Sequence, residues 1–268
     1  MIIFPQAKIN LGLHVLKKRE DSYHEVDTCM YSIPLFDILE ILPADQFSFK
    51  QTGLAVDGDV ESNLCVKAFR LIQNEFGIPT IYMHLRKQIP MGAGLGGGSS
   101  DAAHVINALN ELFSLQLSIS KREELASQLG SDCPFFIEGT PKIATGRGEI
   151  LEEISVDLKG KYLQLIYPDI HVGTAEAYSG VDFYTGTRSV SDIVSAPISE
   201  WQGYLENSFE KSIFKKHPIM LSIKETLIQN GASYAAMSGS GSTLFGIFET
   251  EQQKLDLPIS NQQFCLEL

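Results

Sequence analysis

The stretch PMGAGLGGGSSD occupies residues 90–101 and runs into AAHVINALNEL, whose apolar residues recur at the spacing of a helix. Glycine loses more backbone freedom on folding than any other residue, so a glycine-rich stretch needs a structural reason. One strong reason is a backbone that bends sharply and presents its N–H groups to a phosphate at a helix N-terminus. A flexible linker fits less well, because linkers are not usually joined to a well-formed amphipathic helix. The stretch therefore predicts a phosphate-binding loop, with Ser99 and Ser100 able to cap the helix.

The stretch does not match three familiar types of glycine-rich phosphate-binding loop. Gly92, Gly94 and Gly97 match the dinucleotide pattern G-x-G-x-x-G, but that fold needs a second strand ending in an acid about 20 residues later. The corresponding region reads LSISKREEL, which is helical. A Walker loop needs Lys and then Ser or Thr after its last glycine, whereas Gly98 is followed by Ser99. The sequences H-R-D and D-F-G of protein kinases do not occur. A dinucleotide-dependent oxidoreductase is thus a weakened alternative.

Composition limits the class of protein and its partners. The 268 residues are 44% hydrophobic and 20% charged, which is ordinary for a globular protein. A net charge of −12 argues against nucleic acid or an anionic membrane as a partner. No apolar run approaches the roughly 18 residues of a membrane helix, and the first residues lack the order of a signal peptide. The scattered cysteines and histidines predict reduced thiols and no metal site, so we expect a cytoplasmic protein.

The pattern along the chain mixes strands and helices. Apolar alternation and β-forming residues predict strands in the first half, and helical periodicity with capping residues predicts helices between them. Strands are expected over 8–16, 37–44, 46–50, 80–85, 162–170 and 244–248, and helices over 61–79, 102–112, 120–130 and about 217–230. We expect 131–139 to turn into a strand, 171–181 to be a loop entering a helix, and 182–200 to be a surface connection. Without a clean βαβ repeat, the fold class is α+β rather than a doubly wound sheet, and the domains are expected to be 1–155 and 156–268.

Three segments together resemble a known family. PQAKINLGL at 5–13, PMGAGLGGGSSDAA at 90–103 and MSGSGSTLFG at 237–246 resemble the three motifs of the GHMP kinase superfamily, which includes galacto-, homoserine, mevalonate and phosphomevalonate kinases. Tyr23-His24, ESNL at 61–64 and GSDCPFF around Asp132 resemble the branch that phosphorylates 4-diphosphocytidyl-2-C-methyl-D-erythritol in non-mevalonate isoprenoid synthesis. The family usually has glycine before the Tyr-His pair, where this chain has Ser22.

The resemblance implies a fold and a reaction. It implies an N-terminal ribosomal-protein-like α+β domain and a C-terminal ferredoxin-like α+β domain, with ATP and the second substrate meeting between them. It also implies transfer of the γ-phosphoryl group of ATP, bound with Mg²⁺, to a hydroxyl of the methylerythritol moiety. The partners are expected to be these small molecules, and the protein a monomer or a homodimer. A kinase of the homoserine or mevalonate type and a catalytically silent nucleotide-binding protein remain alternatives.

The resemblance also assigns roles to individual residues. Asp132 matches the catalytic aspartate that accepts the hydroxyl proton, and Lys8 matches the cation that stabilises the moving phosphoryl group. The residues implied for ATP are Pro90, Met91, Gly92, Ala93, Gly94, Leu95, Gly96, Gly97, Gly98, Ser99 and Ser100 of the loop, with Asn63, Leu64 and Lys87 around the base. Those implied or suggested for the acceptor are Asn10, Tyr23, His24, Thr174, Tyr178, Gly239, Ser240 and Gly241. Tyr23 and Tyr178 are the candidates for stacking on cytosine, and His24 is the candidate for its edge.

Overall fold

The computed structural model describes residues 1–55 and 58–268, and these form two compact units built from interleaved segments. The first unit comprises Met1–Lys8, Leu35–Met91 and Gly96–Thr140, and the second comprises Ile9–Pro34, Gly92–Leu95 and Pro141–Leu268. The chain passes between them along its two longest strands and through the glycine loop. The expected α+β fold class is confirmed. The division at residue 155 stays a prediction about sequence domains.

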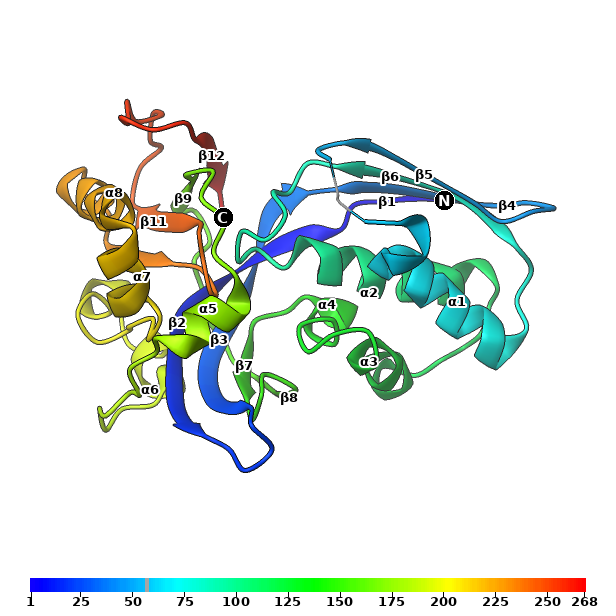
Figure 1. Ribbon diagram of the computed structural model, residues 1–268, viewed down its shortest axis with the longest axis horizontal. Coiled ribbons are helices and arrows are strands. Elements are labelled where there is room, and N and C mark those ends of the chain that lie inside the picture. Colours follow the sequence, from blue (N-terminus) through cyan, green and yellow to red (C-terminus); the bar gives the residue numbers. More distant parts are fainter. Residues whose placement is uncertain (56–57) are drawn as a thin grey trace. The chain divides into compact units, whose positions relative to one another are not determined.

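The first unit has one sheet with helices against it (Figure 1). Its sheet has the order β1-β4-β6-β5, in which β5 and β6 are parallel and the other pairs antiparallel. The stacked rings of Phe47 and Phe69 join the sheet side to a helix, with their centroids 4.8 Å apart. The elements are β1 (Ile2–Ile3), β4 (Ile38–Pro43), β5 (Ser48–Gly53), η1 (Val60–Ser62), α1 (Leu64–Phe76), β6 (Ile81–Lys87), α2 (Gly97–Leu112), α3 (Ile119–Ser127) and α4 (Phe135–Glu138).

The whole of α1 and the buried face of α2 follow their sequence signals. The Asn63 side chain caps α1 by accepting the N–H of Cys65, and Gly77 ends the helix with a φ of +66°. In α2, Ala102, Ala103, Ile106 and Leu109 are fully buried, as their spacing predicts. The helix is thereby fixed in the core of the first unit, and its N-terminus is held at the end of the glycine loop.

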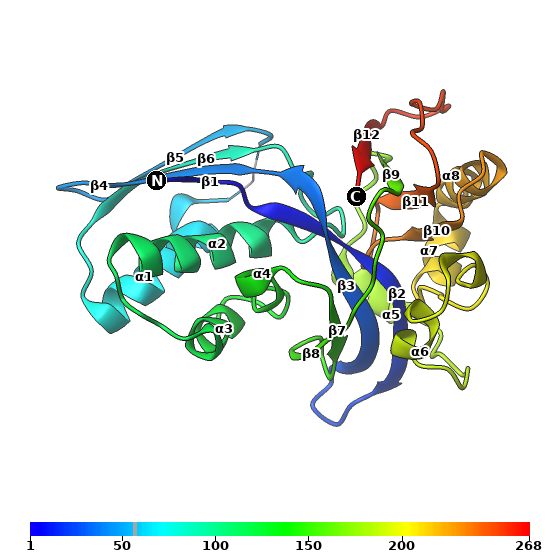
Figure 2. The ribbon, with the colours of Figure 1, turned by 180° about the vertical axis from the view of Figure 1, so that it is seen from behind.

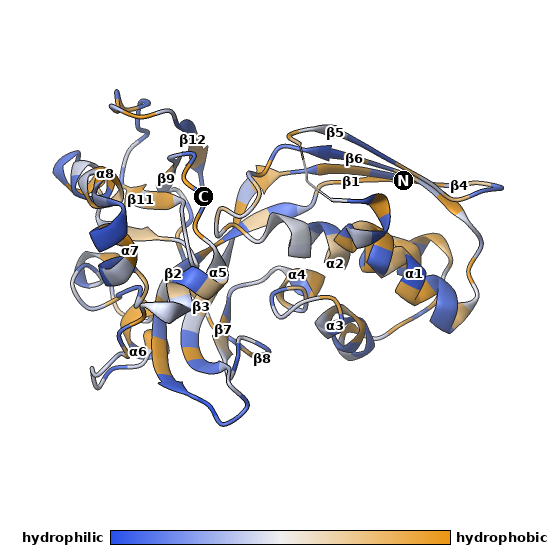
Figure 3. Ribbon diagram, viewed as in Figure 1, coloured by the Kyte–Doolittle hydropathy of each residue, from blue (hydrophilic) through white to orange (hydrophobic). Residues whose placement is uncertain are grey.

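The second unit contains two four-stranded sheets. One has the order β2-β3-β7-β8, and the other is antiparallel with the order β10-β11-β9-β12 and has α8 against it (Figure 2). Every residue of β11 is buried, and Figure 3 shows its apolar character. The elements are β2 (Gln6–Lys18), β3 (His24–Phe36), β7 (Lys142–Thr145), β8 (Ile150–Glu153), β9 (Tyr162–Tyr167), α5 (Thr174–Ser179), α6 (Val190–Val194), η2 (Ile198–Glu200), α7 (Glu210–Lys216), α8 (Pro218–Gln229), β10 (Tyr234–Met237), β11 (Leu244–Phe248) and β12 (Gln262–Glu267).

Three local expectations are wrong. The strand expected within 131–139 is instead the short helix α4, because a brief apolar run does not distinguish a buried helical turn from a strand. The surface connection expected at 182–200 is wrong for one part: most of the segment is exposed or half-buried, but it contains α6, which has a capping box at Ser189 and buries Val190, Ile193 and Val194. The helix α2 begins before the two serines, so neither of them is its N-cap.

The cysteines agree with expectation, since all four are free thiols and three are buried. Among the described residues, no helix is long and apolar enough to cross a membrane. The same residues contain no group of three or more His, Cys, Asp or Glu side chains that could hold a metal ion.

Candidate active site

The glycine loop ends in the first unit at the N-terminus of α2. Gly96 is the N-cap with a φ of +68°, and the helix begins at Gly97 without a side-chain cap. The first N–H groups of a helix have no partner within it, and they carry the positive end of the helix dipole. A Cβ atom at Gly96 would lie 2.8 Å from Cζ of Phe136 and 3.1 Å from Cγ of Lys8. Glycine is therefore required here, and Lys8 lies directly beside the start of the helix.

The other part of the loop, Gly92–Leu95, belongs to the second unit. Gly94 has a φ of +77°, and a Cβ atom there would lie 2.0 Å from the carbonyl oxygen of Ser238. The Ser238 hydroxyl donates a hydrogen bond to the carbonyl of Gly94 at 2.8 Å and accepts one from the N–H of Asn10 at 3.3 Å. The N–H of Thr243 also bonds the carbonyl of Ala93. The three sequence motifs of the resemblance thus meet at Ser238.

Lys8 and Asp132 form an ion pair in the first unit. The Lys8 Nζ atom lies 3.6 Å from Oδ2 of Asp132, and the lysine side chain is 4% exposed whereas the aspartate side chain is 34% exposed. Burial lowers the pKa of Lys8, and the charge of Asp132 and the hydrogen bond that its carboxylate accepts from Lys8 act in the opposite direction. The structure therefore brings together the two residues to which the sequence assigns catalysis, with the carboxylate as the accessible member.

Asp132 is held by the turn that precedes α4. Its neighbour Cys133 donates its backbone N–H to the carbonyl of Gly130, and the Ser99 side chain hydrogen-bonds the Cys133 thiol. Ser99 lies in the first turn of α2. This contact ties the turn that carries Asp132 to the first turn of α2. Ser100, in contrast, is fully buried, and its hydroxyl lies 3.4 Å from Nδ1 of His104.

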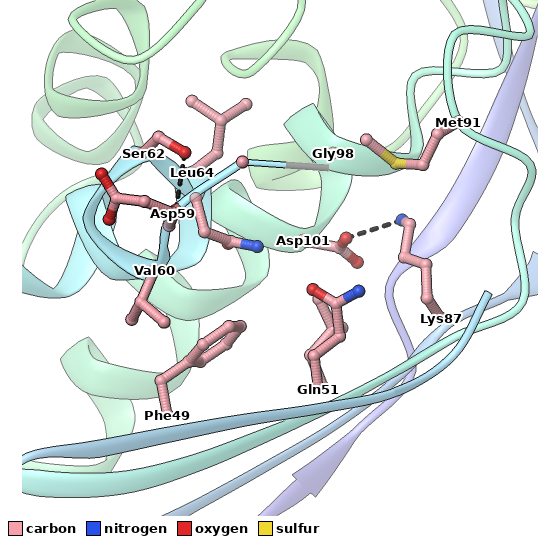
Figure 4. A pocket seen from close by; sticks show the side chains of 13 residues that line it. Phe49, Gln51, Asp59, Val60, Ser62, Leu64, Lys87, Met91, Gly98 and Asp101 are labelled. Atoms are coloured by element: carbon pink, nitrogen blue, oxygen red, sulfur yellow. Dashed lines mark hydrogen bonds and ion pairs between the residues drawn. The ribbon is translucent and has the colours of Figure 1, made fainter. Parts of the chain in front are cut away.

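A pocket of about 380 Å³ opens beside the same helix in the first unit (Figure 4). The volume is within the usual range for small-molecule sites, about 300–1,000 Å³. Five residues predicted for ATP line it, namely Asn63, Leu64, Lys87, Met91 and Gly98. The others are Phe49, Gln51, Gly58, Asp59, Val60, Ser62, Leu85 and Asp101. The apolar side chains in this lining, such as Phe49, Leu64 and Leu85, can contact a flat heterocycle.

The ammonium group of Lys87 is engaged by two buried carboxylates. It donates to Oδ2 of Asp101 at 2.7 Å and to Oδ2 of Asp37, and all three side chains are at most 3% exposed. Burial by itself lowers the pKa of Lys87, but the charges of Asp101 and Asp37 raise it above its ordinary value. Lys87 thus lines the pocket, and its charge neutralises the two carboxylates; the role predicted for it in ATP binding stays a prediction. Sequence reasoning assigned a role to neither Asp37, which no motif marks, nor Asp101, which ends the glycine-rich stretch.

Aromatic rings gather around His24 in the second unit. His24 stacks on Tyr178 with ring centroids 4.6 Å apart and 22° between the planes, and Tyr178 meets the ring of Phe209 edge-on. The ring centroid of Phe183 lies 6.2 Å from that of His24. Phe183 is 46% exposed and Tyr23 is 57% exposed. Sequence reasoning missed Phe183, although an aromatic in a polar segment was the available signal.

The turn before the Tyr23-His24 pair has an unusual backbone. Ser22 has a φ of +70°, in the left-handed region that favours glycine. The family usually has glycine at this position, so the departure noted in the sequence keeps the backbone conformation and changes only the residue. The guanidinium group of Arg147 lies 4.8 Å from the centre of the Tyr23 ring. This contact supports the exposed ring.

The remaining predicted acceptor residues also lie in the second unit. Asn10 donates from Nδ2 to the Thr28 hydroxyl at 2.9 Å, and Thr174 is exposed at the start of α5. Gly239 and Gly241 have positive φ values, and Ser240 between them is half-buried. A bond between Asn10 and Asp132, one of the two roles considered for Asn10, stays a prediction.

The chain matches known kinases over nearly its full length. Residues 63–140 match the family model described as GHMP kinases N terminal domain, and residues 195–256 match GHMP kinases C terminal. A 4-diphosphocytidyl-2-C-methyl-D-erythritol kinase of Cytophaga hutchinsonii is 47% identical over 99% of both chains. A crystal structure of 4-(cytidine 5'-diphospho)-2C-methyl-D-erythritol kinase is 32% identical, with a TM-score of 0.80 over 92% of this chain and 90% of the other.

A solved structure of much lower sequence identity has the same fold. Homoserine kinase from Cytophaga hutchinsonii superposes with a TM-score of 0.71 over 98% of this chain and 95% of its own, at 15% identity. At that identity the likeness concerns the fold alone. The family models and the relatives of high identity carry the assignment further: the chain belongs to the GHMP kinases, in the family of 4-diphosphocytidyl-2-C-methyl-D-erythritol kinases.

Proposed function

We propose that this enzyme transfers the γ-phosphoryl group of ATP to a hydroxyl of 4-diphosphocytidyl-2-C-methyl-D-erythritol, a step of non-mevalonate isoprenoid synthesis. The observation that carries the chemical part is the Lys8–Asp132 pair beside the N-terminus of α2. The identity of the acceptor is supported by full-length similarity to kinases of that name.

Asp132 and Lys8 divide the chemistry between them in this proposal. The acceptor oxygen attacks the γ-phosphorus, the bond to the β,γ-bridging oxygen breaks, and ADP leaves. The hydroxyl proton passes to the Asp132 carboxylate, which is exposed enough to release it to water. Lys8 and the free N–H groups at the start of α2 stabilise the charge on the phosphoryl oxygens.

The pocket of the first unit is the proposed site of the adenine base. Its apolar members, among them Phe49, Leu64 and Leu85, provide the flat surface that a purine requires. Two residues of the glycine-rich stretch, Met91 and Gly98, line this pocket. The backbone N–H groups of the stretch are proposed to hold the phosphates.

Mg²⁺ is proposed to enter with the nucleotide. It requires near-octahedral oxygen ligands, and at nucleotide sites it usually takes one or two protein ligands together with phosphates and water. The Ser99 hydroxyl in the first turn of α2 would fit this demand together with phosphate oxygens and water, and no cluster of three acidic or histidine ligands is found among the described residues. The ion, when bound, neutralises charge on the transferring phosphates.

The aromatic cluster of the second unit is the proposed site of the cytosine ring. Tyr23 and Phe183 present exposed faces on which a base can stack, and Tyr178 supports His24 from behind. Burial lowers the pKa of His24, with the charge of Lys18 adding to the effect, so a neutral imidazole faces the base. A neutral ring can both donate to and accept from the polar edge of cytosine.

We also propose a cytoplasmic location and a monomer or homodimer. The free, mostly buried cysteines are typical of proteins in a reducing compartment. The net charge of −12 supports small molecules, rather than nucleic acids, as the partners.

A substrate panel tests the proposed reaction. Release of ADP is followed with the cytidyl-diphosphate compound, mevalonate and homoserine, each at equal concentration with ATP and Mg²⁺. We expect turnover with the first compound alone. Phosphorylation of mevalonate or homoserine in its place would contradict the proposal and favour the alternative acceptors.

A further inference from the structure

A buried cluster in the second unit holds the loop of the third motif from behind. Asn207 is 4% exposed, and both hydrogens of its Nδ2 are used, one on the carbonyl of Met237 at 2.7 Å and one on that of Gly239 at 2.8 Å. Its Oδ1 accepts the N–H of Phe209 at 3.0 Å. The asparagine amide is therefore fully committed, with its donors on the loop and its acceptor on its own segment.

Glu210 holds the same loop through a different group. Its Oε1 accepts the N–H of Met237 at 2.8 Å, and its Oε2 accepts from the Lys224 ammonium group at 2.5 Å. Burial raises the pKa of Glu210, and the charge of Lys224 acts against this rise. A buried carboxylate is retained only where such partners satisfy it. Glu210 thus binds the backbone N–H of Met237, and Asn207 binds its carbonyl.

The segment that carries these residues is also anchored to the strand of the first motif. Leu13 on β2 pairs in parallel with Asn207, and its N–H and carbonyl bond the carbonyl of Glu206 and the N–H of Ser208, both at 2.8 Å. Asn10 lies three residues earlier on the same strand. The backbone of Asn207 is therefore held by β2. Its side chain in turn holds residues 237–239.

The loop held by Asn207 contains Ser238, the residue at which the three motifs meet. Ser238, between the two carbonyls bonded by Asn207, contacts Asn10 and Gly94 as described above. A shift of the loop would consequently move Ser238 away from both. Resting on the proposed function, and on the resemblance, which implies that Gly239–Gly241 contact the acceptor, we propose that Asn207, supported by Glu210, is a positioning residue that sets the third-motif loop for phosphoryl transfer.

The principal test is Asn207→Asp, which keeps the shape and replaces the donating amide by a carboxylate facing two carbonyl oxygens. A displacement of about 1 Å at a site can cost about 100-fold in turnover, so we expect kcat to fall by 10-fold to 100-fold. Because a protonated carboxyl can donate one hydrogen bond, the ratio of the variant's kcat to that of the wild type should rise as pH falls. A residue that served stability alone would alter the melting temperature and leave kcat per folded enzyme unchanged.

Hydrogen–deuterium exchange provides a second readout that does not depend on the substrate. We expect faster exchange at 237–243 in N207D, with α1 of the first unit unchanged. The matched control is Asn230→Asp, since the exposed Asn230 also donates Nδ2 to a carbonyl, that of Thr226. It should change neither kcat nor exchange at 237–243. If N207D does not fold, Glu210→Gln replaces it, with the same pattern expected at smaller size.

The outcomes separate the two proposals. A folded N207D with the kcat and exchange rates of the wild type overturns the positioning role, as does faster loop exchange without any loss of kcat. If the wild type itself phosphorylates none of the compounds, the proposed function falls. Exchange at 237–243 then decides whether Asn207 holds the loop.

Discussion

The proposed chemistry depends on a single carboxylate, Asp132. Asp132→Asn keeps the size of the side chain but removes the proton acceptor, so turnover should fall by about 10²-fold to 10⁴-fold. Nucleotide binding should persist, because the pocket in the first unit does not include this residue. The two effects are measured by ADP release and by titration with a fluorescent ATP analogue.

The control for Asp132 is another carboxylate paired with a lysine. Glu176 lies 2.9 Å from Lys216 on the surface, and exposed pairs of this kind contribute little to stability. Glu176→Gln should therefore leave turnover unchanged. Near-normal turnover of Asp132→Asn would remove Asp132 from the mechanism, and loss of nucleotide binding in that variant would instead indicate a structural role.

Asp101 makes the stability of the chain depend on pH. Burial, joined by the charge of Asp37 and opposed by that of Lys87, raises its pKa to about 7. Because the folded pKa exceeds the unfolded one, the stability that this group contributes is complete below about pH 4 and is lost as the pH rises through about 7. In the Asp101→Asn variant this side chain cannot ionise. The melting temperature of the variant should therefore rise relative to that of the wild type as the pH rises.

Thermal melts from about pH 4 to about pH 8 measure this difference for both proteins. The exposed Glu124 of α3 provides the control: its side chain is 62% exposed and its pair with Lys121 contributes little to stability, so Glu124→Gln should melt close to the wild type. A difference in melting temperature between Asp101→Asn and the wild type that stays constant with pH would show that Asp101 has the same pKa in the folded and unfolded chains.

At the scale of elements, the glycine loop makes the sharpest structural demand. Gly94→Ala combines a positive φ with a contact of 2.0 Å to a backbone oxygen, and that oxygen cannot move as a side chain can. Gly77 also has a positive φ, of +66°, but has nothing within 4 Å of the added atom. Gly77→Ala should therefore cost only the conformational term, about 1–2 kcal/mol, whereas Gly94→Ala should cost more. Chemical denaturation of both variants measures the two costs, and equal costs would contradict the crowding at Gly94.

Helices with their own signals could be predicted from sequence, and pairing between distant segments could not. Asn63 and Gly77 mark the ends of α1 because capping is local. The start of α2 was placed too late, since a glycine in the left-handed region can act as N-cap without a side chain. The pocket needed the parallel pairing of Gln51 with Leu85 across β5 and β6, which α1 separates in sequence. No local pattern specifies that register.

The same limit applies to the candidate site. Lys8 and Asp132 were found because motifs mark them, whereas Asn207 and Asp37 act through contacts that only the folded chain forms. Their burial is dictated by neighbours far away in sequence, so a single chain without its fold gives no sign of it. The residues proposed to touch substrate were thus easier to predict than the residues proposed to position them.

At the scale of the whole molecule, the two bases of the reaction should protect different segments from hydrogen exchange. A non-hydrolysable ATP analogue should slow exchange at 49–51 and 59–64, which line the pocket of the first unit. Cytidine diphosphate should slow exchange around His24 and 178–183 in the second unit, because bound ligands suppress local opening where they bind. Tyr23→Ala should weaken the second protection and leave the first intact, since its exposed ring is proposed to stack on cytosine alone. Protection of 59–64 by cytidine diphosphate, with none near His24, would reverse the assignment of the two bases and leave the aromatic cluster without a ligand.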